Sequence, residues 1–322
     1  MIKTYLGIDV GSISTKGVLI TENREIIAHA YLRTQGQPIE AIKNLIKELF
    51  KDNKNIEIKG VGTTGSARRL AGVIVGADVI KNEIITHAVA ATYFYPETRT
   101  IIEIGGQDSK IILLKDSVPV DFAMNTVCAA GTGSFLEHQA IRLGIPIEEF
   151  GDYALRAKKA ATIAGRCTVF AESDMIHKTQ LGIPIEEIIR GLCEAIVRNY
   201  LGTVAKGKDI QPLILFQGGV AANIGVKTAF ERALGIEVIV PQHFLIMGAI
   251  GAAFIAQDYT QKTKSTKFIG ENLLDINFKT KTFECRDCTN FCEVIETYKN
   301  TQIIDRYGDR CGKWSEKLPN II

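Results

Sequence analysis

The fold of this 322-residue chain is decided by two similar stretches, Asp9-Val-Gly-Ser-Ile-Ser-Thr-Lys16 and Glu103-Ile-Gly-Gly-Gln-Asp-Ser-Lys110. In each, an apolar strand runs into glycine, small polar residues and lysine, and then continues as a second strand. Because such a turn lacks bulky side chains, its N–H groups, hydroxyls and ammonium can converge on a polyphosphate. The two stretches therefore predict a duplicated α/β fold with phosphate-binding turns.

The segments around the first turn predict an antiparallel meander and then a helix, at Ile2–Val10, Val18–Ile20, Ile26–Leu32 and Pro38–Phe50. The second turn joins predicted strands at Thr100–Ile104 and Ile111–Leu114. A third predicted strand, Leu213–Phe216, runs into Gln217-Gly218-Gly219-Val220, and Asn223 lies on the helix that would follow. We expect this third turn to contact a nucleoside.

The overall composition is that of a globular protein with little net charge. The chain has 38 Lys and Arg against 36 Asp and Glu, a net charge of +2, and 46% hydrophobic residues. This balance argues against nucleic acid as a partner and against extensive disorder. The longest apolar run, Phe244–Ala256, is shorter than the roughly 20 residues that cross a bilayer, so we expect a buried helix and no membrane partner. No export signal is visible near Met1, and we expect a cytoplasmic location.

Two of the seven cysteines precede a repeated string. Cys128 comes before Leu143-Gly-Ile-Pro-Ile-Glu-Glu149, and Cys167 comes before Leu181-Gly-Ile-Pro-Ile-Glu-Glu187. The Gly and Pro of each copy suit a helix end and a restart, so each cysteine is expected near the N-terminus of a comparable helix, where thiolate is favoured. Two thiolates cannot hold a four-cysteine iron–sulfur cluster, but a twofold homodimer would supply two more. The alternative is a pair of buried structural cysteines.

A small-residue turn follows Cys128 directly, at Ala129-Ala-Gly131-Thr132-Gly133-Ser134. It lies at or near the start of a predicted helix, where free N–H groups favour an anion, although a tightly packed helix entry explains it equally well. Cys193 lies in an amphipathic helical pattern and is expected in the core.

The chain changes character after Tyr259, where the polar segment Thr260–Lys267 predicts a linker. The region beyond it holds Trp314, the single tryptophan, and four cysteines, Cys285, Cys288, Cys292 and Cys311. Their spacing is compatible with a zinc knuckle or a second iron–sulfur site and does not decide between them.

Together, the two strand–turn stretches, Asn125-Thr-Val-Cys-Ala-Ala-Gly-Thr-Gly133 and Phe216-Gln-Gly-Gly-Val220 closely resemble the activator family of 2-hydroxyacyl-CoA dehydratases. That family also includes benzoyl-CoA reductase ATPase subunits and the reductases of double-cubane cluster proteins. The resemblance covers residues 3–257. It implies a duplicated ribonuclease-H-like fold of the acetate kinase, sugar kinase, heat-shock chaperone and actin superfamily. The expected halves are residues 1–98 with 245–258, and residues 99–244, followed by a cysteine-rich extension at 268–322.

The resemblance also implies a function: an ATP-hydrolysing iron–sulfur reductase that donates low-potential electrons. The expected protein is a homodimer sharing one [4Fe–4S] cluster, held by Cys128 and Cys167 of each subunit, and is oxygen-sensitive and suited to anaerobic conditions. ATP hydrolysis would drive one electron into a partner iron–sulfur enzyme, either a 2-hydroxyacyl-CoA dehydratase or a double-cubane cluster protein, with ferredoxin or flavodoxin as the electron source. The extension is absent from the short activators of the family, which leaves the dehydratase assignment open.

The expected nucleotide site combines all of the turns. Phosphate contacts are expected from Gly11, Ser12, Thr15, Lys16, Gly105, Gly106, Gly131, Thr132 and Gly133. Adenosine and ribose contacts are expected from Gly218, Gly219, Val220 and Asn223. Asp9, Gln107 and Asp108 are the candidates for holding Mg²⁺ through water or positioning the attacking water.

Two other classes of function compete with this interpretation. A sugar or acyl kinase of the same superfamily would use the turns to transfer phosphate, but it leaves the paired Cys128 and Cys167 unexplained. A metal-binding regulator switched by ATP would show little ATP turnover and no reversible one-electron chemistry.

Overall fold

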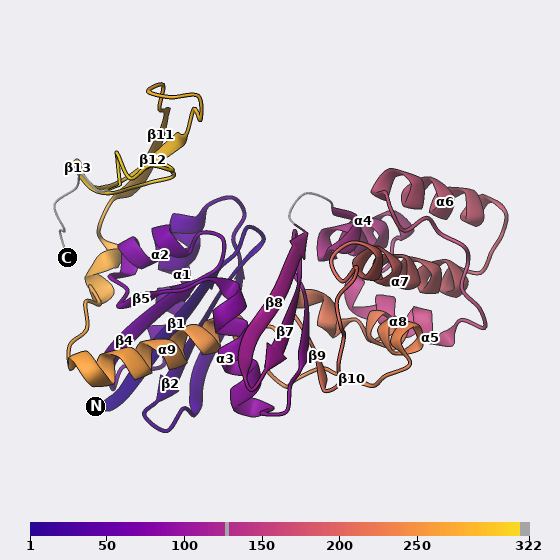
Figure 1. The fold of residues 1–322 in the computed structure, drawn as a ribbon, viewed down its shortest axis with the longest axis horizontal. Helices are drawn as coiled ribbons and strands as arrows, with labels where there is room; N and C mark the ends of the chain where they lie inside the picture. Colours follow the sequence, from indigo (N-terminus) through magenta and orange to yellow (C-terminus); the bar gives the residue numbers. More distant parts are fainter. Residues whose placement is uncertain (126–128, 316–322) are drawn as a thin grey trace. The chain divides into compact units, whose positions relative to one another are not determined.

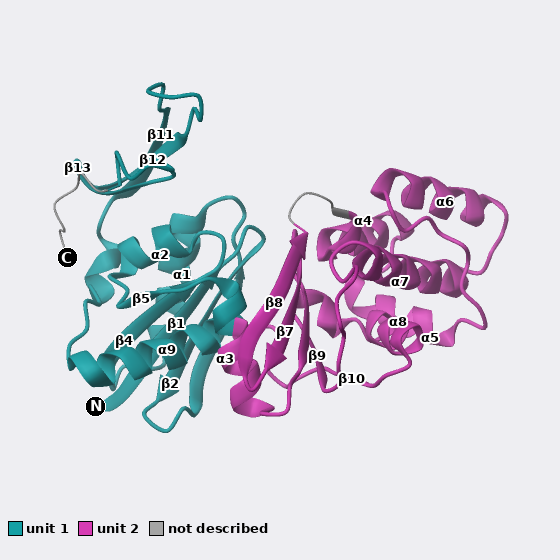
Figure 2. Ribbon diagram, in the orientation of Figure 1, with its two compact units in different colours: residues 1–86, 248–322 teal, residues 87–247 magenta. Residues whose placement is uncertain are grey.

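A computed structural model describes residues 1–125 and 129–315 of the chain (Figure 1). The chain divides into two compact units, residues 1–86 with 248–322 and residues 87–247 (Figure 2). Among the described residues, no helix is long and apolar enough to span a membrane.

The first unit is built on a five-stranded sheet of order β3-β2-β1-β4-β5. Its elements are β1 (Ile2–Val10), β2 (Ser14–Thr21), β3 (Ile26–Arg33), α1 (Pro38–Lys51), β4 (Ile56–Thr64), α2 (Arg68–Val75), β5 (Val79–Ile80) and α9 (Met247–Thr263). The predicted antiparallel meander and helix are therefore confirmed. Strand β2 starts at Ser14 rather than Val18, because the first turn is only three residues long.

Helix α9 lies directly against the sheet because glycines leave room for its backbone. A Cβ on Gly7 of β1 would lie 2.8 Å from the backbone nitrogen of Ala253, closer than real Cβ contacts come. The expected buried helix is thus confirmed, but it starts at Met247 and continues to Thr263, past the predicted boundary at Tyr259. The polar side chains of this last turn lie on an exposed helix end, which explains why composition alone suggested a linker.

The second unit repeats the plan with a sheet of order β10-β9-β6-β7-β8. Its strands are β6 (Thr100–Ile104), β7 (Ser109–Lys115), β8 (Val118–Asn125), β9 (Ile214–Gln217) and β10 (Val238–Ile239). Counted from β3 in the first sheet and from β8 in the second, each sheet has two antiparallel strand pairs followed by two parallel ones. The predicted duplication is confirmed at this level.

The helices of the second unit pack around one apolar core. They are α4 (Gly133–Leu143), α5 (Phe150–Arg156), α6 (Thr168–Gln180), α7 (Ile185–Gly202) and α8 (Ile224–Leu234), while α3 (Glu83–Phe94) begins in the first unit and ends in the second. Helix α7 supplies the largest buried face, and Cys193 on it is fully buried, as predicted. Burial raises the pKa of the Cys193 thiol to about 12, so this thiol stays protonated.

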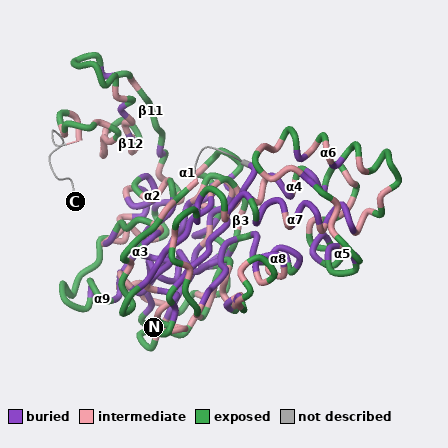
Figure 3. Tube along the Cα trace, turned by 45° about the vertical axis from the view of Figure 1, so that its right-hand side comes forward, coloured by how far each residue is buried: buried purple, intermediate pink, exposed green. Residues whose placement is uncertain are grey.

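The C-terminal extension is a three-stranded antiparallel sheet, β11 (Phe278–Glu284), β12 (Glu293–Lys299) and β13 (Gln302–Tyr307). Its base packs into the first unit through the buried Leu273 and Phe278. Arg69 of α2 holds it further, since its guanidinium donates two 3.0 Å hydrogen bonds to the Asp305 carboxylate. Most residues toward the other end of the extension are exposed or only partly buried (Figure 3).

Candidate functional site

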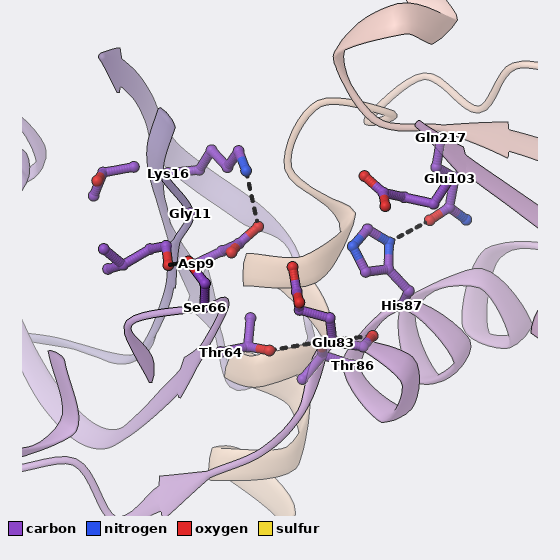
Figure 4. Close-up of polar contacts among 12 residues, drawn as sticks. Asp9, Gly11, Lys16, Thr64, Ser66, Glu83, Thr86, His87, Glu103 and Gln217 are labelled. Atoms are coloured by element: carbon purple, nitrogen blue, oxygen red, sulfur yellow. Dashed lines mark hydrogen bonds and ion pairs between the residues drawn. The ribbon is translucent and has the colours of Figure 1, made fainter. Parts of the chain in front are cut away.

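The first predicted turn is a tight connection between β1 and β2. The Gly11 N–H donates to the Ser14 carbonyl at 2.9 Å, and the register places Asp9 opposite Lys16. The Lys16 ammonium lies 3.1 Å from Asp9 Oδ2 (Figure 4), and the Lys16 side chain is 17% exposed against 5% for Asp9. The ammonium at this turn is therefore partly open to solvent while its carboxylate partner is buried.

Asp9 has one oxygen to spare. Its Oδ1 is buried and finds no hydrogen-bond partner among the described residues. Gly65, which follows β4, lies against this oxygen: a Cβ there would be 2.7 Å from Asp9 Oδ1. A buried carboxylate oxygen without a partner is costly, so this geometry suits a ligand that donates hydrogen bonds, such as metal-bound water.

The hydroxyls of the first turn have different roles. Thr15 is fully buried, and its hydroxyl donates to Thr34 Oγ1 at 2.9 Å, which in turn donates to the Gly11 carbonyl at 2.8 Å. Thr15 therefore holds the turn in shape. Ser12 is exposed and is the hydroxyl of the turn that solvent reaches.

The second turn has the same construction within its own unit. The Gly105 N–H donates to the Asp108 carbonyl at 2.9 Å, and Lys110 lies opposite Glu103 across the strands. The Lys110 ammonium is 1% exposed and contacts Glu103 Oε2 at 2.9 Å and Asp108 Oδ2 at 2.8 Å. The register thus makes Glu103, and not Asp108, the structural counterpart of Asp9.

Three predicted glycine segments come together in the second unit. The Gly133 N–H at the start of α4 donates to the Gly105 carbonyl at 2.8 Å, and the Ser134 N–H donates to the Gly106 carbonyl at 2.9 Å. Gly106 is partly exposed and Gln107 exposed at the tip of the β6–β7 turn. Thr132, at the N-cap of α4, and the preceding Gly131 are buried.

The third turn, which follows β9, packs against the end of β6. Gly218 has φ +85°, and a Cβ on it would lie 2.5 Å from the Ile104 carbonyl oxygen and 2.7 Å from Glu103 Oε1. Val220 is buried, and its Cγ2 would lie 3.2 Å from a Cβ on Gly133, whereas Gly219 is exposed. Only glycine fits at Gly218, so the backbone can approach the acidic end of β6 closely.

Asn223 has a structural task at this turn. It is the N-cap of α8, and its side-chain oxygen accepts a 3.1 Å hydrogen bond from the Val226 N–H. Its Nδ2 is buried and has no hydrogen-bond partner among the described residues. The carbonyl of the amide is thus committed to the helix, and only the amino group remains for a ligand.

Cys167 lies at the N-cap of α6, as the repeated string predicts, and is partly exposed. Gly144 ends α4 and Gly182 follows α6, both with φ near +70°, and Pro184 precedes α7, which confirms the expected helix ends and restart. Cys128 lies outside the described residues, which resume at Ala129.

Helix α7 contacts both the segment before Cys167 and the second turn. The Asn199 amide donates to the Gly165 carbonyl at 2.7 Å, and its oxygen would lie 2.7 Å from a Cβ on Gly131. The next residue, Tyr200, donates its hydroxyl to the Lys110 carbonyl at 2.7 Å. Burial, and then the charge of Glu103, raise the pKa of Tyr200 well above its usual value, so the phenol stays a hydrogen-bond donor.

The remaining predicted ligands are the four cysteines of the extension. Cys285 is buried, Cys292 is partly exposed, and Cys288 and Cys311 are exposed. Among the described residues, no three His, Cys, Asp or Glu side chains are positioned as they stand to hold a metal ion.

Sequence reasoning missed several polar residues beside these turns. Thr64 at the end of β4 shares a 3.1 Å hydrogen bond with Thr86 of α3, and His87 Nδ1 lies 2.7 Å from Gln217 Oε1 (Figure 4). The signal for the first was present, since β4 runs into Thr-Thr-Gly-Ser at 63–66, another strand followed by a glycine turn. His87 lies within an ordinary helical pattern that carries no such signal.

Comparisons with known proteins agree with this architecture. The activator of lactoyl-CoA dehydratase from Anaerotignum propionicum is 35% identical over 260 residues, covering 80% of this chain and 98% of that relative. The structure of the activator of 2-hydroxyisocaproyl-CoA dehydratase from Clostridium difficile with bound ADPNP has a TM-score of 0.74 at 32% identity, covering 81% and 97%. Component A of the Acidaminococcus fermentans (R)-2-hydroxyglutaryl-CoA dehydratase has a TM-score of 0.73 at 31% identity, covering 80% and 99%.

The duplicated sheets with their glycine turns define an actin-like ATPase fold, as the expected superfamily requires. Within that fold, the chain belongs to the BadF/BadG/BcrA/BcrD ATPase family, which it matches over residues 6–256. The match ends within α9 and does not include the C-terminal extension.

Proposed function

We propose that this chain is an ATP-hydrolysing activator that transfers single low-potential electrons to a partner iron–sulfur enzyme. The relatives activate 2-hydroxyacyl-CoA dehydratases, and one similar structure holds an ATP analogue, which supports both ATP as substrate and an enzyme as partner. The observation that carries the proposal is helix α7, whose adjacent residues Asn199 and Tyr200 contact the cysteine-bearing segment and the second glycine turn.

Each turn has a proposed task in nucleotide binding. Lys16 and the exposed Ser12 bind phosphate oxygens, and the spare Oδ1 of Asp9 accepts from water held by Mg²⁺. In the second unit, the backbone at Gly106, at the tip of the β6–β7 turn, binds phosphate, with the exposed Gln107 and the partly exposed Asp108 toward the attacking water. Gly218, Gly219 and the spare amino group of Asn223 contact the nucleoside.

The residues available for a [4Fe–4S] cluster fit its chemistry. Iron–sulfur clusters are ligated by thiolates, and Cys167 offers a partly exposed sulfur at the N-cap of α6. Cys128 is the second proposed ligand, and two more come from a second subunit. When bound, the group supplies a carrier that takes one electron from reduced ferredoxin or flavodoxin and gives one to the acceptor.

The surface beside Cys167 supports a second copy of the chain as the cluster's other half. Val169 and Phe170, the second and third residues of α6, are each 66% exposed. Ile176 and Leu181 add further exposed apolar area on the same helix and its end. Large apolar side chains gathered next to an expected ligand favour a self-complementary interface.

Coupling between nucleotide and cluster follows from the contacts of α7. Movement of β7 when the γ-phosphate is lost would be carried by the Lys110 carbonyl to Tyr200, and by Asn199 to the carbonyl of Gly165, two residues before Cys167. Because Asn199 and Tyr200 are adjacent near the C-terminal end of α7, a shift of that end of the helix would move both contacts together.

The test is an anaerobic purification of wild type, Cys167→Ser and the control Cys193→Ser. We expect about four irons per dimer and an ATP-sensitive reduced-cluster electron paramagnetic resonance signal in wild type and control, and neither in Cys167→Ser. A wild type without such a signal, or a Cys167→Ser protein that keeps it, contradicts the electron-transfer proposal. Phosphorylation of a sugar or carboxylic acid by the cluster-free protein would favour the kinase alternative instead.

A further inference from the structure

The tip of the C-terminal extension consists of the 285–292 loop and the 311–314 segment beside it. Few apolar side chains are buried in this part of the chain. From β11 to the end of the described chain, two purely hydrocarbon side chains are buried, those of Phe278 and Val294. Phe278 belongs to the core of the first unit. The Trp314 ring makes an edge-to-face contact with the Phe283 ring, with 4.9 Å between the ring centroids. A small sheet with so little buried area usually needs a cross-link or a metal to hold its shape.

The backbone brings the first three cysteines of the tip close together. The β11–β12 register continues to Cys285 and Cys292, and the Cys285 N–H donates to the Cys292 carbonyl at 2.8 Å. Cys288 lies in the loop between them, where its carbonyl accepts from the Phe291 N–H at 3.4 Å. The loop is thus a compact knuckle with three thiols within eight residues.

The fourth cysteine is held beside this loop by contacts on both sides of it. Arg310, directly before Cys311, donates to Asn290 Oδ1 at 3.4 Å, and Lys313, two residues after it, pairs with Asp287. Asn290 and Asp287 are both residues of the knuckle. Two independent contacts therefore place the Cys311 segment, distant in sequence, against the loop that carries the other three thiols.

The local charge and backbone also suit a group of thiolates. Gly312, next to Cys311, has φ +77°, a conformation in which successive N–H groups can face an anion. Arg286 and Lys313 pair with Glu284 and Asp287 around the same loop, and Arg310 contacts the neutral Asn290, so its positive charge can offset part of the net negative charge of four thiolates on a divalent ion.

We propose that Cys285, Cys288, Cys292 and Cys311 bind one Zn²⁺ ion as four thiolates and that this ion holds the tip of the extension together. A single tetrahedral ion suits a cross-strand pair and a C-x-x-C loop, because its sulfur ligands must approach within a few ångströms of one another. As they stand, the thiols do not converge, but Cys288 and Cys311 are exposed and can rotate without disrupting a packed core. Metal binding and ordering of the tip would then be one process.

The test measures zinc in the full chain, expressed with zinc and purified anaerobically. We expect about one zinc per chain in wild type and less than about 0.1 in the Cys288→Ser/Cys311→Ser double variant. Both replaced side chains are exposed, so their loss leaves the core intact. The matched control, Thr289→Ser in the same loop, should keep its zinc.

A second measurement reports on the tip itself. Trypsin cleavage after Arg286, followed by mass spectrometry, should be slow in the zinc-loaded wild type and become at least about tenfold faster after chelation. The double variant should be cleaved fast with or without zinc.

Three results would overturn the proposal. They are a wild type without zinc, zinc that survives in the double variant but is lost in Cys167→Ser, and iron in place of zinc at these four cysteines. None of these outcomes depends on the proposed electron transfer, since the redox cluster is assigned to other cysteines.

Discussion

Replacing Gly218 by alanine should destabilise the second unit and weaken nucleotide binding together. With φ at +85° and ψ at 173°, Gly218 lies in a backbone region essentially restricted to glycine, and an L-residue there costs about 1–3 kcal/mol of backbone strain. The added Cβ would also lie 2.5 Å from the Ile104 carbonyl oxygen and 2.7 Å from Glu103 Oε1. Overpacking of this kind typically adds about 1–3 kcal/mol, so we expect a total loss of about 2–6 kcal/mol in the free energy of unfolding.

Gly235 provides the matched control. Its φ is also positive, at +67°, but with ψ at 19° it has the left-handed helical conformation, and a Cβ on it would meet nothing within 4 Å. Gly235→Ala should therefore lose only the strain, about 1–2 kcal/mol. Because it ends α8 away from the proposed nucleotide contacts, its affinity for ATP should stay within about twofold of wild type, while Gly218→Ala should lose at least about tenfold.

Urea unfolding and calorimetric titration with a non-hydrolysable ATP analogue measure the two effects separately. Equal destabilisation by the two substitutions would show that the close contacts at Gly218 add nothing to the loss in free energy of unfolding. A strongly destabilised Gly218→Ala protein with unchanged nucleotide affinity would refute the placement of this turn in the nucleotide site.

Four further outcomes follow from the contacts described. Lys110→Met leaves the buried Glu103 carboxylate without its ammonium and should cost about 3–5 kcal/mol in urea unfolding, part of which a Glu103→Gln/Lys110→Met double variant recovers. Asn199→Leu removes the donor to the Gly165 carbonyl and should lower iron per chain, measured after anaerobic purification, without preventing folding. Cys193, with a pKa of about 12, should carry only about 10⁻⁴ thiolate at pH 8 and resist iodoacetamide until the protein is unfolded, as mass spectrometry would show. The hydrogen bond from the Tyr298 hydroxyl, followed by the Arg306 contacts, lowers the pKa of Glu296 from 4.5. Glu296→Gln should therefore be less stable than wild type near pH 7. In thermal melts, this difference should vanish as the pH falls below 4.5 through the folded-state pKa.

The strand–turn–strand elements and helix ends that the sequence predicted correctly are those fixed by local chemistry. A strand ending in glycine, a three- or four-residue turn and a lysine on the return strand place Lys16 opposite Asp9 and Lys110 opposite Glu103, since hairpin register is set by turn length. In the same way, the Gly and Pro of the repeated string fix where α6 ends and α7 begins, and so place Cys167 near a helix start.

The parts that could not be predicted depend on contacts between distant residues. Thr15 resembles a phosphate ligand in sequence, yet its hydroxyl donates to Thr34, the residue that follows β3. Asn199 and Tyr200 look like ordinary residues of an amphipathic helix, and their partners, Gly165 and the Lys110 carbonyl, are 34 and 90 positions away. No local pattern specifies such partners, because tertiary packing decides them.

The duplicated plan shows how one construction can serve two purposes. In the first unit, the lysine of the turn is partly exposed and its acidic partner keeps one oxygen free, whereas in the second unit the lysine is buried between two carboxylates. The open copy is suited to binding a ligand, and the closed copy is suited to holding β7 rigidly against Tyr200. We infer that the second turn passes a nucleotide-dependent movement to α7. The buried ion pair of Lys110 would keep β7 rigid enough to move the helix.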